Sequence, residues 1–249
     1  MQGKVCLITG TGGSIGAASA LAFAREGAFV VGCDIDPDRD ATTVTRVHED
    51  GGVMISAAPS DLSRLDHCAR VVETAMARHG RIDVLFNNAG RPTYGSIQSS
   101  DDRHWYDTID HELHLVYLLT KAAWPALAQS AGTIINMASV AGWIGLPALD
   151  GIAHSSVKGA ILAMTRHMAM EGRDFGIRAN SISPGVIDSP SVRRRSQDAR
   201  WDELMRGKIM RRSYGRPEEI AAVAMFLASD ESSFVNGTDI RADGGMTAW

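Results

Sequence analysis

The chain has 249 residues, of which 45% are hydrophobic and 22% are charged, and its formal net charge is -4. This composition is typical of a globular protein with one large α/β core. The acidic balance argues against nucleic acid or an anionic membrane as a partner, and no apolar run reaches the length of a membrane span.

The three cysteines are widely spaced and form no CxxC pair, which favours a reducing compartment. The N-terminal stretch MQGKVCLITG runs directly into a strand pattern and lacks the layout of a signal peptide. We therefore expect a cytoplasmic protein.

Short apolar runs alternate with longer amphipathic runs along the chain. Strands are expected at 4–10, 28–34, 53–58, 82–90, 132–139, 177–185 and 237–245. Helices are expected at 15–27, 38–50, 63–79, 155–174 and 217–229, with one or two more within 101–130. Apolar runs without alternation indicate strands buried on both faces, and strand–helix–strand repeats indicate a parallel sheet. The sequence thus predicts an α/β fold, with 1–249 as a single doubly wound domain, helices on both faces, and an irregular stretch at 186–216.

A glycine-rich turn, TGTGGSIG at 9–16, joins the first expected strand to the first helix. Such a turn lets a pyrophosphate approach the backbone at the N-terminus of the helix. Asp34 ends the second strand, where a carboxylate binds the adenosine ribose and repels a 2′-phosphate. No arginine follows at once, and Arg39 is the nearest. This pattern predicts NAD rather than NADP, the other interpretation being a structural turn with a helix-capping Asp34.

Six separate pieces, in order, make the sequence resemble the short-chain dehydrogenase/reductase family over nearly its whole length. They are TGTGGSIG (9–16), Asp61–Leu62, NNAG (87–90), INMASVAG (135–142), HSSVKG (154–159) and SPGVIDS (183–189). The resemblance implies a single Rossmann domain that oxidises or reduces a small molecule. The stretch 229–245 resembles the family segment that packs between subunits, which implies a homotetramer or homodimer.

The resemblance also implies which residues contact NAD. Asp61 would lie by the adenine, Asn88 beneath the adenosine ribose, and the stretch 184–189 against the nicotinamide. Ser14 stands where the family usually has a glycine, with the extra glycine moved to Gly13. The expected cofactor-binding residues are Gly10, Gly13, Ser14, Ile15, Gly16, Asp34, Asp61, Leu62, Asn88, Ala89, Gly90, Lys158, Pro184, Gly185 and Ile187.

The active site of the family usually contains Asn, Ser, Tyr and Lys. Ser139 and Lys158 match two of these positions directly. His154 stands where the tyrosine belongs, and Glu112 where the asparagine belongs. The separation between Ser139 and His154 is also longer than the usual Ser–Tyr spacing.

The two departures can be understood as one compensated change. In a helix His154 and Lys158 share a face, one turn apart. An unperturbed imidazole titrates at about pH 6.5, so it serves as an acid/base near neutrality without the help that a tyrosine needs. A carboxylate at Glu112 would pair with Lys158, with His154 or with both.

The prediction is therefore an NAD(H)-dependent oxidoreductase that interconverts a secondary alcohol and a ketone, with catalytic residues Ser139, His154, Lys158 and Glu112. One alternative is a lyase or isomerase of the same fold that uses His154 for proton transfer alone. Another is a non-catalytic NAD-binding protein. Tyr94 is a further candidate for the missing phenol.

The run HELH at 111–114 lacks a third ligand and the HExxH pattern, so no metal is expected. In the family, 186–216 forms a mobile lobe over the substrate. Its arginines Arg193, Arg194 and Arg195 would either meet an anionic substrate or form a solvated helix face.

Three apolar residues follow Ser139 and could line the substrate pocket. They are Trp143, Leu146 and Leu149.

Overall fold

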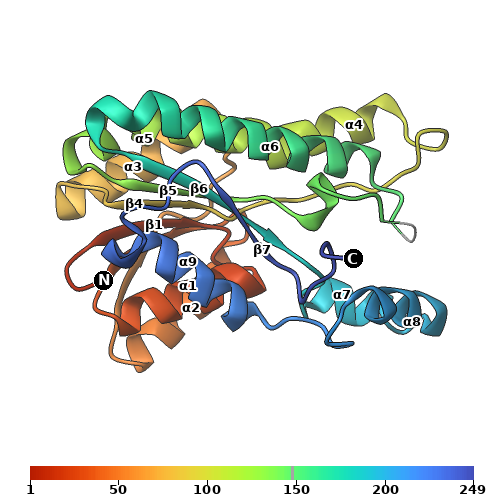
Figure 1. Ribbon diagram of the computed structural model, residues 1–249. Coiled ribbons are helices and arrows are strands. Elements are labelled where there is room, and N and C mark those ends of the chain that lie inside the picture. The colour runs from red at the N-terminus through yellow and green to blue at the C-terminus, as the bar shows by residue number, and fades with distance from the viewer. Residues whose placement is uncertain (147–148) are drawn as a thin grey trace.

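The computed structural model describes residues 1–146 and 149–249. It is built on one seven-stranded sheet with the order β3-β2-β1-β4-β5-β6-β7, in which every pairing is parallel (Figure 1). The strands are β1 (Val5–Thr9), β2 (Phe29–Cys33), β3 (Val53–Ser56), β4 (Val84–Asn87), β5 (Thr133–Met137), β6 (Arg178–Pro184) and β7 (Asp239–Ala242). This sheet confirms the predicted doubly wound α/β fold.

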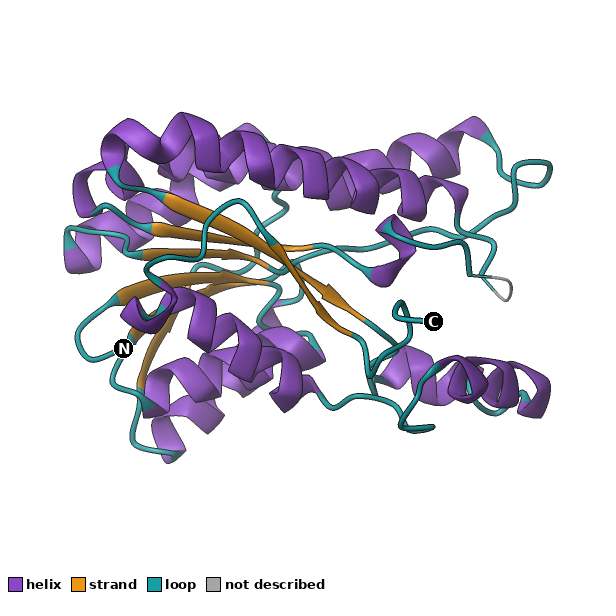
Figure 2. Cartoon of the chain, viewed as in Figure 1, coloured by secondary structure: helices purple, strands orange, loops and turns teal. Residues whose placement is uncertain are grey.

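Helices cover both faces of the sheet, as Figures 1 and 2 show. The α-helices are α1 (Ser14–Arg25), α2 (Pro37–Glu49), α3 (Leu65–His79), α4 (Asp102–Ile109), α5 (Leu115–Ser130), α6 (Ile152–Glu171), α7 (Pro190–Arg195), α8 (Ala199–Lys208) and α9 (Pro217–Ala228). The short helices are the π-helix η1 (Asp110–His114) and the 3-10 helices η2 (Val140–Gly142), η3 (Gly172–Phe175) and η4 (Asp230–Ser232). Elements expected from the sequence end within three residues of those observed.

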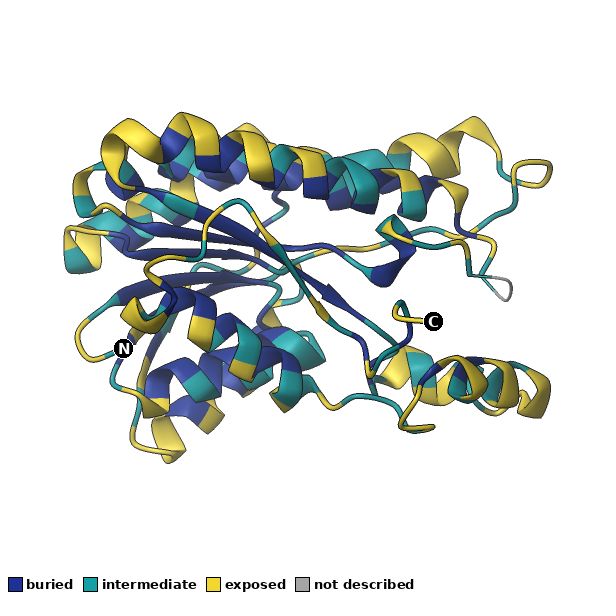
Figure 3. Cartoon of the chain, in the orientation of Figure 1, coloured by how far each residue is buried: buried dark blue, intermediate teal, exposed yellow. Residues whose placement is uncertain are grey.

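The sheet separates two hydrophobic cores, which explains why its strands are apolar without alternation. Leu7 and Ile134 belong to the core with α3, α5 and α6, whereas their neighbours Ile8 and Ile135 belong to the core with α1 and α9. All four side chains are fully buried. Figure 3 shows the sheet as the most deeply buried layer of the molecule. No described helix is both long and apolar enough to cross a membrane.

Two stretches differ from the sequence expectation. The helical region 101–130 contains the π-helix η1 between α4 and α5. A π-helix has more residues per turn than an α-helix, and the pattern of apolar residues in the sequence does not reveal it. The stretch 186–216, expected to be irregular, contains α7 and α8, whose first turns are capped by the side chains of Ser189 and Asp198.

The segment with α7 and α8, called the lobe below, projects beyond the carboxyl edge of the sheet (Figure 1). Met205 and Ile209 pack with Val140 and the C-terminal Met246 in a small separate core. The lobe therefore rests on residues that follow β5 and β7.

Candidate active site

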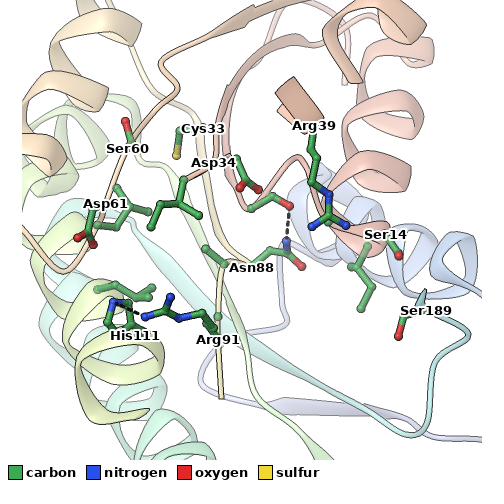
Figure 4. Close-up of a pocket in the computed structure, with 18 residues that line it drawn as sticks. Ser14, Cys33, Asp34, Arg39, Ser60, Asp61, Asn88, Arg91, His111 and Ser189 are labelled. Atoms are coloured by element: carbon green, nitrogen blue, oxygen red, sulfur yellow. Dashed lines mark hydrogen bonds between the residues drawn. The ribbon is translucent and has the colours of Figure 1, made fainter. Parts of the chain in front are cut away.

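A cavity of about 390 Å³ opens at the carboxyl ends of β1, β2 and β4 (Figure 4). In a doubly wound parallel sheet this edge is where ligands bind. The lining residues are Gly10, Gly13, Ser14, Ile15, Cys33, Asp34, Ile35, Arg39, Ser60, Asp61, Leu62, Asn88, Ala89, Gly90, Arg91, His111, Leu115 and Ser189. Most of the cofactor-binding residues expected from the sequence are thus brought together around one space.

The glycine-rich turn needs its glycines because the backbone folds tightly on itself. Gly10 has a φ of +72°, a conformation that residues with side chains rarely adopt. A Cβ on Gly16 would lie 2.1 Å from the Gly10 carbonyl oxygen, so no side chain fits there. Asn88 ties β4 to this turn by donating to the Thr9 carbonyl oxygen at 2.8 Å. The bare backbone at the start of α1 fits a dinucleotide pyrophosphate.

Asp34 lies at the end of β2 and points into the cavity (Figure 4). Its carboxylate accepts hydrogen bonds from the backbone N–H groups of Gly12 and Asp36, both at 2.9 Å. These bonds orient the carboxylate toward the nucleotide-binding turn. Arg39 lines the same part of the cavity, so a cation stands near the carboxylate.

Asp61 lies across the cavity from Ser14 (Figure 4), and Leu62 also lines this cavity. Partial burial by itself raises the pKa of Asp61. Hydrogen bonds from the hydroxyl and N–H groups of Ser63, together with the nearby His111 and His67, reverse this and hold that pKa below its ordinary value. The carboxylate is therefore ionised at neutral pH.

The stretch after β6 reaches this cavity only at Ser189. Gly185 and Ile187 line a different cavity, of about 260 Å³, beside the chain after β7. Pro184 is the last residue of β6 and lines neither of these two cavities. The predicted nicotinamide contacts of these three residues stay predictions.

Glu112 occupies the π-helix η1 and is 3% exposed. Its Oε2 lies 2.6 Å from Nδ1 of His154, and its Oε1 lies 3.3 Å from Nζ of Lys158. Lys158 also donates to the Met137 carbonyl oxygen at the end of β5, at 3.0 Å. His154 and Lys158 are both buried on α6. The structure therefore joins three of the predicted catalytic residues in one cluster.

The charges of this cluster compensate one another. Burial favours a higher pKa for Glu112, but the ammonium of Lys158 and the hydrogen bond from His154 outweigh it and place the pKa below the usual glutamate range. An ionised carboxylate only accepts hydrogen bonds, so Nδ1 of His154 carries a proton and donates it. In neutral imidazole the other ring nitrogen, Nε2, is then the free proton acceptor.

The cluster adjoins the cofactor cavity. A Cβ on Gly90, which lines that cavity, would lie 3.2 Å from Oε1 of Glu112. The absence of a side chain at Gly90 lets η1 approach the loop after β4. The buried cluster and the cavity thus share the wall formed by Gly90.

Ser139 follows β5 and caps η2, accepting a hydrogen bond from the Ala141 N–H at 3.1 Å. The short helix η2 packs closely on α6, because a Cβ on Gly142 would lie 2.8 Å from the Lys158 carbonyl carbon. This packing brings η2, which Ser139 caps, against the part of α6 that carries Lys158.

Tyr94 lies next to His154, with the ring centres 5.9 Å apart. Burial raises the pKa of its hydroxyl; Arg195 acts in the opposite direction, and Glu112 adds to the rise. The phenol is therefore held neutral and is a poorer acid/base near pH 7 than an imidazole.

Arg91 and His111 line the cofactor cavity but were not among the residues expected there. They lie within 3.2 Å of each other, through the guanidinium and Nε2 of the imidazole. Arg91 directly follows the predicted residue Gly90, and His111 directly precedes the predicted residue Glu112. Their position next to predicted residues is the sequence signal that could have identified them. Among the described residues, no group of three or more His, Cys, Asp or Glu side chains is arranged to hold a metal.

The apolar residues expected around the substrate have different surroundings. Trp143 donates from Nε1 to Asp239 at 2.9 Å and is 47% exposed. Leu146 packs on the small core under the lobe. Leu149 lines a further cavity with Tyr94 and lobe residues.

Comparison with known proteins gives matches along nearly the whole chain. The family model described as "Enoyl-(Acyl carrier protein) reductase" matches residues 10–247. A 3-oxoacyl-(acyl-carrier-protein) reductase of Thermotoga maritima is 36% identical, over 99% of this chain and 98% of that protein. Dehydrogenase/reductase SDR family member 6 of Danio rerio is 37% identical, over 98% of each.

A 2-keto-3-deoxy-L-fuconate dehydrogenase of Xanthomonas campestris is 38% identical, over 99% of this chain and 81% of that protein. Among solved structures, a short-chain type dehydrogenase/reductase from Mycobacterium marinum superposes with a TM-score of 0.94 at 30% identity, covering 100% of this chain and 97% of the other.

Proposed function

The chain belongs to the short-chain dehydrogenase/reductase family of oxidoreductases, and we propose that it interconverts a secondary alcohol and a ketone with NAD(H), using His154 as the acid/base. The observation that carries this proposal is the 2.6 Å hydrogen bond between Glu112 and Nδ1 of His154. It orients an imidazole at the position where the family usually has a tyrosine.

The residues of the cluster divide the proton chemistry among them. A bound NAD would supply the hydride acceptor. During oxidation, Nε2 of His154 takes the hydroxyl proton of the alcohol as the carbinol C–H hydride leaves. During reduction the imidazolium returns a proton to the oxygen of the carbonyl. Glu112 keeps its own charge throughout and stabilises the imidazolium, as carboxylates do beside catalytic histidines.

Lys158 is suited to hold the nicotinamide ribose. An ammonium has three N–H donors, and in this chain two of them point to Met137 and Glu112. The third is left for a ribose hydroxyl. Ser139, beside α6, would donate its O–H to the substrate oxygen and orient it toward His154.

The choice of NAD over NADP rests on Asp34. A carboxylate fixed by the N–H groups of Gly12 and Asp36 accepts hydrogen bonds from a ribose diol and repels a 2′-phosphate. Arg39 nearby would favour the phosphate, so the preference depends on this one carboxylate. A homotetramer or homodimer, a cytoplasmic location and mobility of the lobe stay predictions.

The proposal is tested by NADH oxidation and NAD⁺ reduction with a panel of ketones and secondary alcohols. We expect turnover by the wild type and a loss of about 100- to 10,000-fold in His154→Ala, the usual contribution of a general acid/base. His167→Ala is the matched control, because His167 is an exposed histidine on the same helix. Full activity of His154→Ala would contradict the proposal, as would a silent wild type alongside an active His154→Tyr.

One observation also favours a second candidate, a lyase or isomerase of this fold. The Glu112–His154 pair can move a proton without any hydride transfer. Exchange of solvent deuterium into a substrate, without a change in NADH absorbance, would identify this activity. Stoichiometric NADH formation would exclude it for that substrate.

A further inference from the structure

A third cavity, of about 490 Å³, lies between the lobe and the loops that follow β4 and precede α6. Tyr94 lines it from the core side and, as described above, lies beside His154. The ring of Tyr94 therefore lies between this cavity and the cluster of Glu112, His154 and Lys158. The other lining residues are Gly95, Ser99, Leu149, Asp150, Arg194, Arg195, Asp198 and Trp201.

The three consecutive arginines of α7 have different surroundings. Arg193 forms two hydrogen bonds with the carboxylate of Asp188, at 2.7 and 3.0 Å. Arg194 and Arg195 instead line the cavity. The guanidinium carbon of Arg195 lies 4.3 Å from the ring centre of Tyr94. Only Arg195 is therefore placed against the active site.

The contact between Arg195 and Tyr94 fixes the guanidinium without using its donors. A cation over an aromatic ring is held by the face of the ring, whereas the N–H groups of a guanidinium point outward in its plane. Within residues 1–146 and 149–249, Arg195 has no hydrogen bond or ion pair through its side chain. Its planar set of donors is free to bind a carboxylate bidentately.

Two carboxylates also line this cavity, and neither neutralises Arg195. Asp198 accepts the backbone N–H groups of Arg200 and Trp201 at the start of α8. Asp150 is exposed on the loop before α6. No ion pair joins either of them to Arg194 or Arg195 within the described parts of the chain.

We propose that the substrate is an oxo acid or hydroxy acid whose carboxylate binds Arg195 while its reacting oxygen faces His154. This inference rests on the proposed function of the same site. The Tyr94 ring lies 5.9 Å from the His154 ring and 4.3 Å from the guanidinium. A short carbon chain lying along that ring spans both groups, which suits a carboxylate a few bonds from the carbonyl.

The test uses matched pairs of 2-oxo, 3-oxo and 4-oxo acids and their primary amides, with NADH. An amide has nearly the shape of the carboxylate but no charge. In at least one pair we expect the wild type to prefer the acid about 10- to 100-fold in kcat/KM, mostly through KM, because a hydrogen-bonded charge pair contributes on that scale. Arg195→Gln should abolish the preference, mainly by raising KM for the acid.

Arg200→Gln is the control, since it removes an equal charge from the lobe without touching the cavity. Turnover of both members of every pair with no preference for the acid, or a preference that survives in Arg195→Gln, overturns the inference and leaves the proposed function standing.

A silent enzyme would contradict the proposed function instead. In that case calorimetric binding of the acids and amides to the NADH complex decides the inference by itself. Acid binding that is weakened in Arg195→Gln supports it, and absent or equal binding overturns it.

Discussion

The two ends of the site are built in different ways. At the nucleotide end, the cavity is shaped by backbone: a tight glycine turn, strand termini, and carboxylates held by N–H groups. At the proposed catalytic end, the buried carboxylate of Glu112 contacts two further buried side chains, His154 and Lys158. The first arrangement uses residues close in sequence, whereas the second joins side chains from distant parts of the chain.

The residues proposed for catalysis include two departures from the usual family pattern, His154 and Glu112. We propose that these departures are one compensated change. The Glu112 carboxylate contacts both His154 and Lys158, so it offsets the charge of the ammonium and of the imidazolium that forms during proton transfer.

The largest effect is expected for Lys158→Met. It removes the ammonium from the buried Glu112 carboxylate and should lower the free energy of unfolding by about 3 kcal/mol, the scale for breaking a buried pair. It should also abolish NADH turnover. Denaturant unfolding measures the first effect, and Lys121→Met, at an exposed position on α5, is the control. Unchanged stability would show that the ammonium of Lys158 does not compensate the buried Glu112 carboxylate.

A second prediction concerns Glu112→Gln, which keeps the shape and removes the charge. We expect turnover at neutral pH to fall about 10- to 100-fold, within the range for general acid/base assistance. The acidic limb of the pH–rate profile should move to lower pH, since the imidazolium loses its carboxylate. Glu171→Gln is the control, because it changes an exposed Glu–His pair on the same helix. A profile identical to the wild type would refute this role.

The pH dependence of stability should also differ between Glu112→Gln and the wild type. The pKa of Glu112 is lowered in the folded protein, so its ionisation stabilises the fold above the ordinary glutamate pKa of about 4.3. This contribution is lost as pH falls below that value toward the folded pKa. The wild type should therefore lose stability on acidification more steeply than Glu112→Gln, which thermal unfolding from pH 6 to pH 3 would reveal.

The smallest effect is expected at the nucleotide end. Asp34→Ser should leave the fold intact and shift the ratio of kcat/KM for NADP over NAD upward by about 10-fold, because the repelling carboxylate is gone and Arg39 remains. Asp38→Ser, at an exposed position in the first turn of α2, is the control. An unchanged ratio would mean that Asp34 does not select the cofactor.

Much of the nucleotide end could be predicted because its signals are local. The glycine turn, the strand that precedes it and Asp34 are close in sequence, and parallel strands bring their carboxyl ends to one edge. Arg91 and His111 were missed because neither residue type signals a nucleotide contact by itself. Gly185 and Ile187 were expected beside the nicotinamide and line another cavity, so these contacts stay predictions.

At the proposed catalytic end, the sequence by itself determined that His154 and Lys158 share a helix, one turn apart. It also determined the doubly wound fold, because apolar runs and helix signals repeat in a fixed order. Only the tertiary structure decided that Glu112, in the π-helix η1, contacts both groups, since its contact with His154 joins residues 42 apart in the chain. Only the tertiary structure likewise decided that Arg195, one of three adjacent arginines on α7, lies over the Tyr94 ring.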